Sequence, residues 1–189
     1  MRTCHFTINV RQKRAFYLVI IRSLFEHCSV VWRPCSPNQI SKFEVIQKRA
    51  IKWIIGRPYD HISDMELYNK EKELDILPVK FKFVFNDLVM IFKVVNSLTP
   101  IQIPQEFFIV TPEKVRHTRS TQNIINHNDK TMYKCEINPC VKSYENCFFY
   151  RAFSLWNRLP FDLRQVPSLS VFRVKLTEFL WSVELSWPG

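Results

Sequence analysis

The chain has 189 residues and a net charge of +10, and close to half of its residues are hydrophobic. This length and apolar content suffice for one domain, or two small ones, with a real core, and they argue against a wholly disordered chain. Gly56 is the only internal glycine, which excludes nucleotide binding through a GxGxxG or GxxxxGK phosphate loop.

The first expected element follows an irregular N-terminus of residues 1–12. Residues 13–32 are almost continuously apolar and suit a buried helix, which Pro34 and Pro37 close. Ser36 is then a plausible N-cap with Pro37 at the first helical position, and Gly56 stands where a C-terminal glycine cap belongs. Apolar residues recur between them at helical spacing, so this is the best-defined helix of the chain.

Two further helices are expected before residue 98. Ser63 and Glu66 form a possible capping box for a short helix that ends near Leu74. The segment after Pro78 begins with strand-like alternation, but its length and its later periodicity favour a helix. The apolar residues that carry this periodicity are Phe85, Leu88, Val89, Phe92 and Val95.

The later part of the chain changes character. Residues 99–142 are rich in Pro, Asn and Thr and read as an irregular connection with room for one short β-hairpin. A helix is expected over Tyr144–Leu159, where Pro160 ends it, and a last helix over 170–181, capped near Ser168 or Ser170. Trp156 and Phe172 are expected to pack these two helices back onto the rest of the fold.

The expected fold class is therefore mainly α, a small bundle of about six helices with a long irregular middle segment. The expected organisation is an irregular start, a basic helical domain, an irregular connection and a C-terminal helical segment, with boundaries at 1–12, 13–98, 99–142 and 143–189.

The cysteines offer a weak zinc pattern. Cys135, Cys140 and Cys147 have the spacing C-x4-C-x6-C, with His127 upstream. Zinc knuckles usually begin with a tighter pair, and a cysteine on an apolar helix face behaves as a small hydrophobe. Isolated thiols are favoured over a zinc site, and we expect no metal and no cofactor.

Catalysis has little support in the sequence. His27 and Cys28 are neighbours on an expected helix, so their side chains point about 100° apart and do not form a nucleophile pair. No nucleophile-elbow sequence is present, and the aspartates are dispersed, whereas two-metal phosphoryl transfer needs clustered carboxylates. We expect no enzymatic activity from this chain alone, and no small-molecule substrate.

The longest apolar run, Ala15–Ile21, is about a third of a membrane span and is followed by no small-residue cleavage site. We therefore expect no membrane insertion and an intracellular protein, nuclear or cytoplasmic and not secreted, whose cysteines are reduced.

The positive charge is concentrated at one end. Residues 1–57 contain eleven Lys and Arg against Glu26 and Glu44, a net charge of +9, and the remainder is close to neutral. A polyanion-binding surface requires such a basic end, although a merely solvated basic face has the same composition. In the stretch 47–58 cations alternate with Trp53, which either stacks on a base or packs inward. The candidate phosphate contacts are Arg22, Lys42, Lys48, Arg49, Lys52 and Arg57.

Three stretches together resemble a known family. RAFYLVIIRSLFEHCSVVWRP is similar to the segment that follows the polymerase core in non-LTR retrotransposon reverse transcriptases. ISKFEVIQKRAIKWIIG resembles their next block, with a Glu-x-x-Gln-x-Arg pattern at Glu44, Gln47 and Arg49. FFYRAFSLWNRLPFDLRQVPSLSVFRVKL looks like their C-terminus, with its Trp-Asn-x-Leu-Pro core, and RHTRST at 116–121 also fits. Jockey-like and related LINE elements are the most similar group.

The resemblance implies a thumb and C-terminal extension of an RNA-directed DNA polymerase, which helps to hold template and primer beside the polymerase core. The resemblance also implies that the catalytic aspartate pair and the endonuclease of the full protein lie outside this fragment. We therefore expect a non-catalytic fragment that binds RNA or an RNA–DNA duplex and has the polymerase core of a full-length element as its protein partner. The alternative is a helical protein-interaction module or an inert remnant of such an element.

Overall fold

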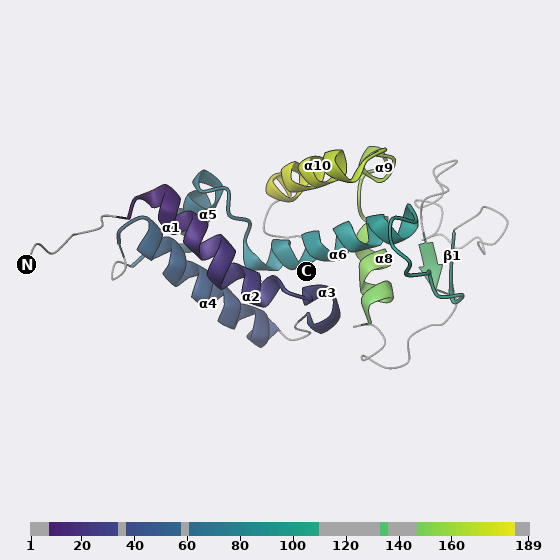
Figure 1. Cartoon of the computed structure of the whole chain (residues 1–189), viewed down its shortest axis with the longest axis horizontal. Coiled ribbons are helices and arrows are strands. Elements are labelled where there is room, and N and C mark those ends of the chain that lie inside the picture. Colours follow the sequence, from purple (N-terminus) through teal and green to yellow (C-terminus); the bar gives the residue numbers. More distant parts are fainter. Residues whose placement is uncertain (1–7, 34–36, 58–60, 110–132, 136–146, 184–189) are drawn as a thin grey trace, which may run out of the picture. The chain divides into compact units, whose positions relative to one another are not determined.

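A computed structural model describes residues 8–33, 37–57, 61–109, 133–135 and 147–183 (Figure 1). These residues are mainly helical, as the sequence predicted. They belong to two compact units, the first reaching to Phe83 and the second extending from Val84 to Val183. The boundary between the two units lies inside one helix. The domain boundaries that the sequence suggested, at 98/99 and 142/143, stay predictions.

The first helical segment of unit 1 is a succession of short helices. They are α1 (Val10–Phe16), the π-helix η1 (Tyr17–Arg22), α2 (Ser23–Glu26) and α3 (Ser29–Trp32). Asn9 and Gln12 form a reciprocal capping box at the start of α1. Cys28 adopts a left-handed backbone conformation with φ 53° and interrupts the helix before α3.

The expectation of a buried helix over 13–32 is wrong in part. Phe16, Ile20 and Leu24 are each more than half exposed, whereas Tyr17 and Phe25 are buried. A run of apolar residues does not reveal which side of a helix meets the core when only one side has packing partners. The segment therefore has one buried side and one exposed apolar side.

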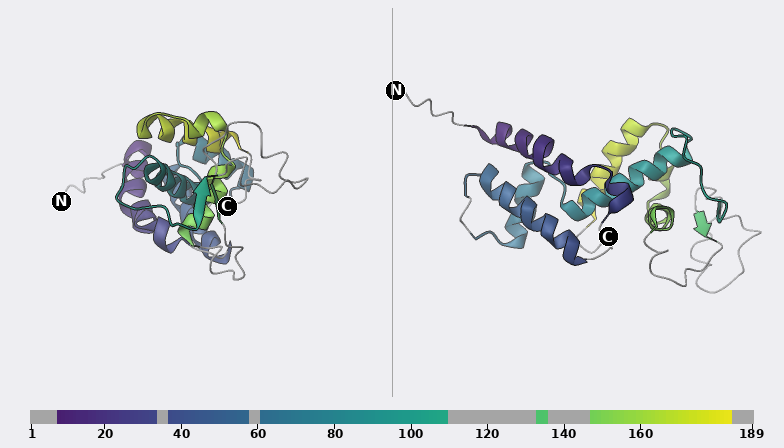
Figure 2. Two further views of the ribbon diagram at one scale, coloured as in Figure 1. Left: turned by 90° about the vertical axis from the view of Figure 1, so that its right-hand side faces the viewer. Right: turned by 60° about the horizontal axis from the view of Figure 1, so that its bottom comes forward.

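Helix α4 (Pro37–Ile54) runs alongside the segment from α1 to α2 in Figure 1 and in the right-hand view of Figure 2. Gly56 ends it with φ +80°, and the Arg57 amide donates to the Lys52 carbonyl at 2.8 Å, the bond expected of a glycine cap. The N-cap expected at Ser36 lies outside the described residues. Helix α5 (Asp64–Glu73) starts as expected, because the Ser63 hydroxyl accepts from the Glu66 amide.

Two apolar clusters hold unit 1 together. The first contains Tyr17, Ala50, Ile54 and Ile76, and the second contains Phe25, Val79 and Phe83. The residues from Val79 to Phe83 are the start of α6 (Val79–Val95), so this helix contributes to unit 1 before it continues into unit 2. The helical reading of the segment after Pro78 is confirmed.

Unit 2 includes a short antiparallel pair of strands, β1 (Phe107–Ile109) and β2 (Tyr133–Cys135). Phe107 pairs with Cys135 and Ile109 with Tyr133. The side-chain amide of Asn157 donates to the Tyr133 carbonyl, and its oxygen accepts from the Tyr133 amide. The pair fits the short hairpin for which the sequence left room, while the residues that connect the strands lie outside the described ones.

The helices of unit 2 pack around three aromatic rings. The helices that follow the strands are α8 (Phe148–Asn157), α9 (Phe161–Arg164) and α10 (Leu169–Ser182), and α10 begins at the Ser168 N-cap. Phe92 of α6 stacks on Phe172 of α10 with ring centroids 4.3 Å apart, and Trp156 of α8 lies 6.0 Å from Phe172. All three rings are buried, so Trp156 and Phe172 pack α8 and α10 back against α6, as the sequence predicted.

Candidate nucleic-acid interface

The exposed side of α4 carries three of the expected phosphate contacts. Lys42 and Arg49 are exposed and Lys52 is half-buried, and the spacings of seven and three residues place them on one side of the helix. Within the described part of the chain these three side chains have no acidic partner. Their charge is therefore available to an external anion.

Two other expected contacts already have acidic neighbours. Lys48 lies 3.2 Å from the Asp64 carboxylate, and Arg57 lies 3.5 Å from that of Glu66. Such solvent-exposed pairs contribute little to stability, so a phosphate can displace them. Lys48 and Arg57 are weaker candidates than Lys42, Arg49 and Lys52. Each of them must break its ion pair with an acidic residue before it can contact a phosphate.

Arg22 is not a phosphate contact in this structure. Its side chain is 4% exposed, and its guanidinium pairs with Glu26 and donates to the Leu77 carbonyl at 2.8 Å. A phosphate would have to enter the core of unit 1 to reach it. The expectation for Arg22 is wrong because its guanidinium is buried against the Leu77 carbonyl. Leu77 lies 55 residues further along the chain, so the sequence around Arg22 gives no sign of this contact.

Trp53 is partly covered by the start of the chain. The Phe16 ring meets it edge-on with centroids 6.0 Å apart, and the Lys13 ammonium lies 5.3 Å above the indole while donating to the Trp53 carbonyl. The inward-packing alternative describes this residue better than base stacking does, since a cation already occupies one ring face. Lys13 is a cation of this region that the sequence reasoning missed.

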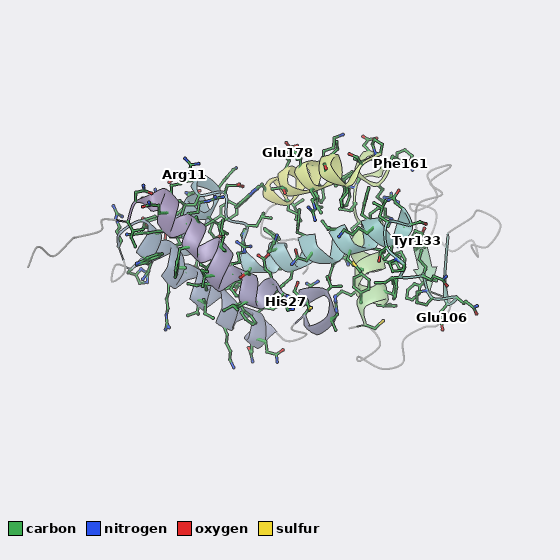
Figure 3. All side chains as sticks on the ribbon, in the orientation of Figure 1. Arg11, His27, Glu106, Tyr133, Phe161 and Glu178 are labelled. Atoms are coloured by element: carbon green, nitrogen blue, oxygen red, sulfur yellow. The ribbon has the colours of Figure 1, made fainter. Side chains whose placement is uncertain are left out.

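A buried polar network fixes the orientation of α4 (Figure 3 shows the side chains of this unit). The Gln47 amide oxygen accepts from the Tyr17 hydroxyl at 2.9 Å, and its nitrogen donates to the Glu71 carboxylate at 2.6 Å and to the Leu77 carbonyl at 3.2 Å. One side chain of α4 thus connects η1, α5 and the segment before α6. The pattern Glu44, Gln47, Arg49 in the sequence did not indicate that its glutamine is buried.

Burial changes the acidity of two groups in this network. It raises the pKa of Glu71 to about 7, and it raises the pKa of Tyr17 well above its usual value, so the phenol stays a donor. The Gln47 hydrogen bond and the Arg22 charge act in the opposite direction on Glu71 but do not outweigh desolvation. The network therefore carries a carboxyl group that titrates near neutral pH.

The described residues hold no other evident reactive site. No three His, Cys, Asp or Glu side chains among them lie close enough to bind one metal ion. Cys28 and Cys147 are thiols outside any disulfide. Of the weak zinc pattern, His127, Cys140 and the side chain of Cys135 lie outside what the structure describes.

No helix in the described ranges has both the length and the apolar character required to cross a bilayer. Comparisons of the chain with protein-family models, with curated proteins and with solved structures found no match.

Proposed function

We propose that this chain is a non-catalytic C-terminal fragment of a LINE-type, jockey-like RNA-directed DNA polymerase, and that its first unit binds template–primer nucleic acid. The three stretches that resemble this family support the identity. The proposed ligand is RNA or an RNA–DNA duplex, and the proposed setting is intracellular, beside the polymerase core of a complete element.

One observation carries the binding proposal. Lys42, Arg49 and Lys52 share one side of α4 and lack acidic partners within the described residues. The buried Gln47 network fixes the opposite side, so the cations are held at a constant orientation. Cations presented in this way contact phosphates without reading the base sequence, so we propose binding that tolerates any sequence.

The test is a salt series. Affinity of the full chain for a labelled RNA–DNA hybrid should fall steeply as salt rises, because each phosphate contact releases counterions. Replacing Lys42, Arg49 and Lys52 with glutamine should flatten the slope of log affinity against log salt by about 2 to 3, from about 0.7–0.9 for each lost contact. Fluorescence anisotropy measures both slopes.

A matched control removes the same charge elsewhere. Lys72, Arg173 and Lys175 are exposed on α5 and α10, and their replacement with glutamine should leave the slope close to that of the original chain. Equal slopes for the original chain and the α4 variant would refute the assignment. Arg22→Gln is not a suitable test here, because it removes a buried guanidinium that pairs with Glu26 and donates to the Leu77 carbonyl.

A second candidate function is a helical interaction module or an inert remnant. The exposed apolar side chains of the first helical segment favour it, since soluble monomers rarely expose a contiguous apolar patch without a partner. Self-aggregation of the isolated chain, together with binding to the hybrid that does not depend on salt, would support this second function over the first.

A further inference from the structure

The first helical segment exposes a regular apolar row. Phe16, Ile20 and Leu24 recur every four residues and are 52%, 51% and 76% exposed. A spacing of four residues is close to one turn of the π-helix η1 and to one turn of the α-helices on each side of it. The three side chains therefore lie on one side of the segment. Figure 3 labels Arg11 and His27 near the two ends of this row.

Helix α4 continues this surface. Phe16 contacts Trp53, the Tyr17 hydroxyl reaches Gln47, and Phe25 lies 5.3 Å from Phe43. The partner numbers fall as the first numbers rise, so the two helices are antiparallel and the residues before Trp53 flank the row. The side of α4 that includes Trp53 carries, at helical spacing, Lys42, Ile46, Arg49 and Trp53.

We call the two rows together the hairpin strip: Phe16, Ile20 and Leu24 on one helix, and Lys42, Ile46, Arg49 and Trp53 on the other. It combines an apolar centre with a cationic edge. The acidic residues of the two helical segments are Glu26, which pairs with Arg22 and Lys82, and Glu44, four residues before Lys48. Neither carboxylate belongs to the strip.

The positive charge of the hairpin strip indicates which kind of partner can bind there. A second copy would bring a segment of the same strong positive charge, which opposes self-association. An amphipathic helix lays apolar anchors at i, i+4 and i+7 into such a surface, and acidic flanks would pair with Lys42 and Arg49. We propose that the hairpin strip is a docking site for an acidic amphipathic helix of a partner protein.

The docking site goes beyond nucleic-acid binding, and its test uses the full chain. The probe is a synthetic helix of about 15 residues with leucines at i, i+4, i+7 and i+11 and glutamates on both flanks. A peptide of the same composition in scrambled order and one with lysine flanks are the controls. We expect saturable binding of the acidic amphipathic peptide and of neither control.

Paired variants locate the binding. Ile20→Ser with Leu24→Ser should weaken the acidic peptide about tenfold or more, because two apolar anchors lose their buried contact. Val171→Ser with Val174→Ser on α10 makes the same chemical change at exposed positions outside the strip and should leave affinity unchanged. Lys42→Glu should weaken the acidic peptide and not the lysine-flanked one.

Three results would overturn the proposal. The first is equal binding of the scrambled peptide. The second is that the chain binds phosphatidylserine vesicles and not the peptide, and the third is that it self-associates, where in either case the Ile20 and Leu24 variants abolish the binding. The vesicle result also separates protein docking from adsorption to an anionic lipid surface. The salt slope on the RNA–DNA hybrid should not change in the Ile20 and Leu24 variants. Failure of docking is therefore distinguishable from failure of nucleic-acid binding.

Discussion

Replacing Asp87 with alanine is expected to reduce the free energy of unfolding of unit 2 by about 3–5 kcal/mol, the cost of leaving a buried ion without its partner. The Asp87 side chain is 1% exposed and that of Arg151 is 14% exposed. The Arg151 guanidinium donates to both carboxylate oxygens, at 2.8 and 3.2 Å, in a bidentate pair that joins α6 to α8.

The measurement is a urea titration followed through the amide NMR signals of α8 and α10 for Asp87→Ala, and through those of α5 for the control. The matched control is Glu73→Ala, which breaks the exposed pair of Lys70 and Glu73 at 2.8 Å and should cost less than about 1 kcal/mol. A loss for Asp87→Ala no larger than the control would show that the ion pair does not hold α8 against α6. A double variant with Arg151→Met should recover part of the loss, because the unpaired charge is then gone.

Replacing Glu71 with glutamine is expected to stabilise unit 1 at neutral and higher pH. The pKa of Glu71 is raised from 4.5 to about 7 by burial, so between these values the folded state binds more protons than the unfolded state. Stability contributed by this group is therefore complete below pH 4.5 and is lost as pH rises through 7. The variant lacks the ionisation, and its amide oxygen can still accept from Gln47.

The two unfolding curves should coincide near pH 4 and separate up to about pH 7, where the variant is more stable by about 3 kcal/mol. Urea midpoints at intervals from pH 4 to 8 measure this. The other charged or titratable groups around Glu71 are Arg22, Glu44 and Tyr17. Burial raises the pKa of Tyr17 well above its usual value, so its phenol keeps its proton throughout this range. Glu73→Gln on the same helix, at an exposed position, should show no such separation, and parallel curves for Glu71→Gln would contradict a titrating buried carboxyl.

The helix ends were predictable because their signals are local. Ser63, Ser168 and Gly56 act on backbone groups within a few residues, and each occupies the cap that the sequence indicated. The helix after Pro78 was predictable for a similar reason, since a long periodic run outweighs a few alternating residues.

The candidate site was predictable only in part. Lys42, Arg49 and Lys52 follow from helical spacing on α4, but the burial of Arg22 depends on a carbonyl far along the chain, and no local pattern encodes that contact. The exposure of Phe16, Ile20 and Leu24 was missed for the converse reason. Composition marks a residue as apolar, while only the packing of the other helices determines whether it is covered.

The Gln47 network constrains the length of α4. A one-residue insertion or deletion turns the helix by about 100° relative to any fixed point, and Gln47 is such a point because its amide is bonded on three sides. A length change between Gln47 and Lys52 would rotate Arg49 or Lys52 away from Lys42. The relative positions of Lys42, Arg49 and Lys52 on this side of α4 are therefore tied to the buried amide of Gln47.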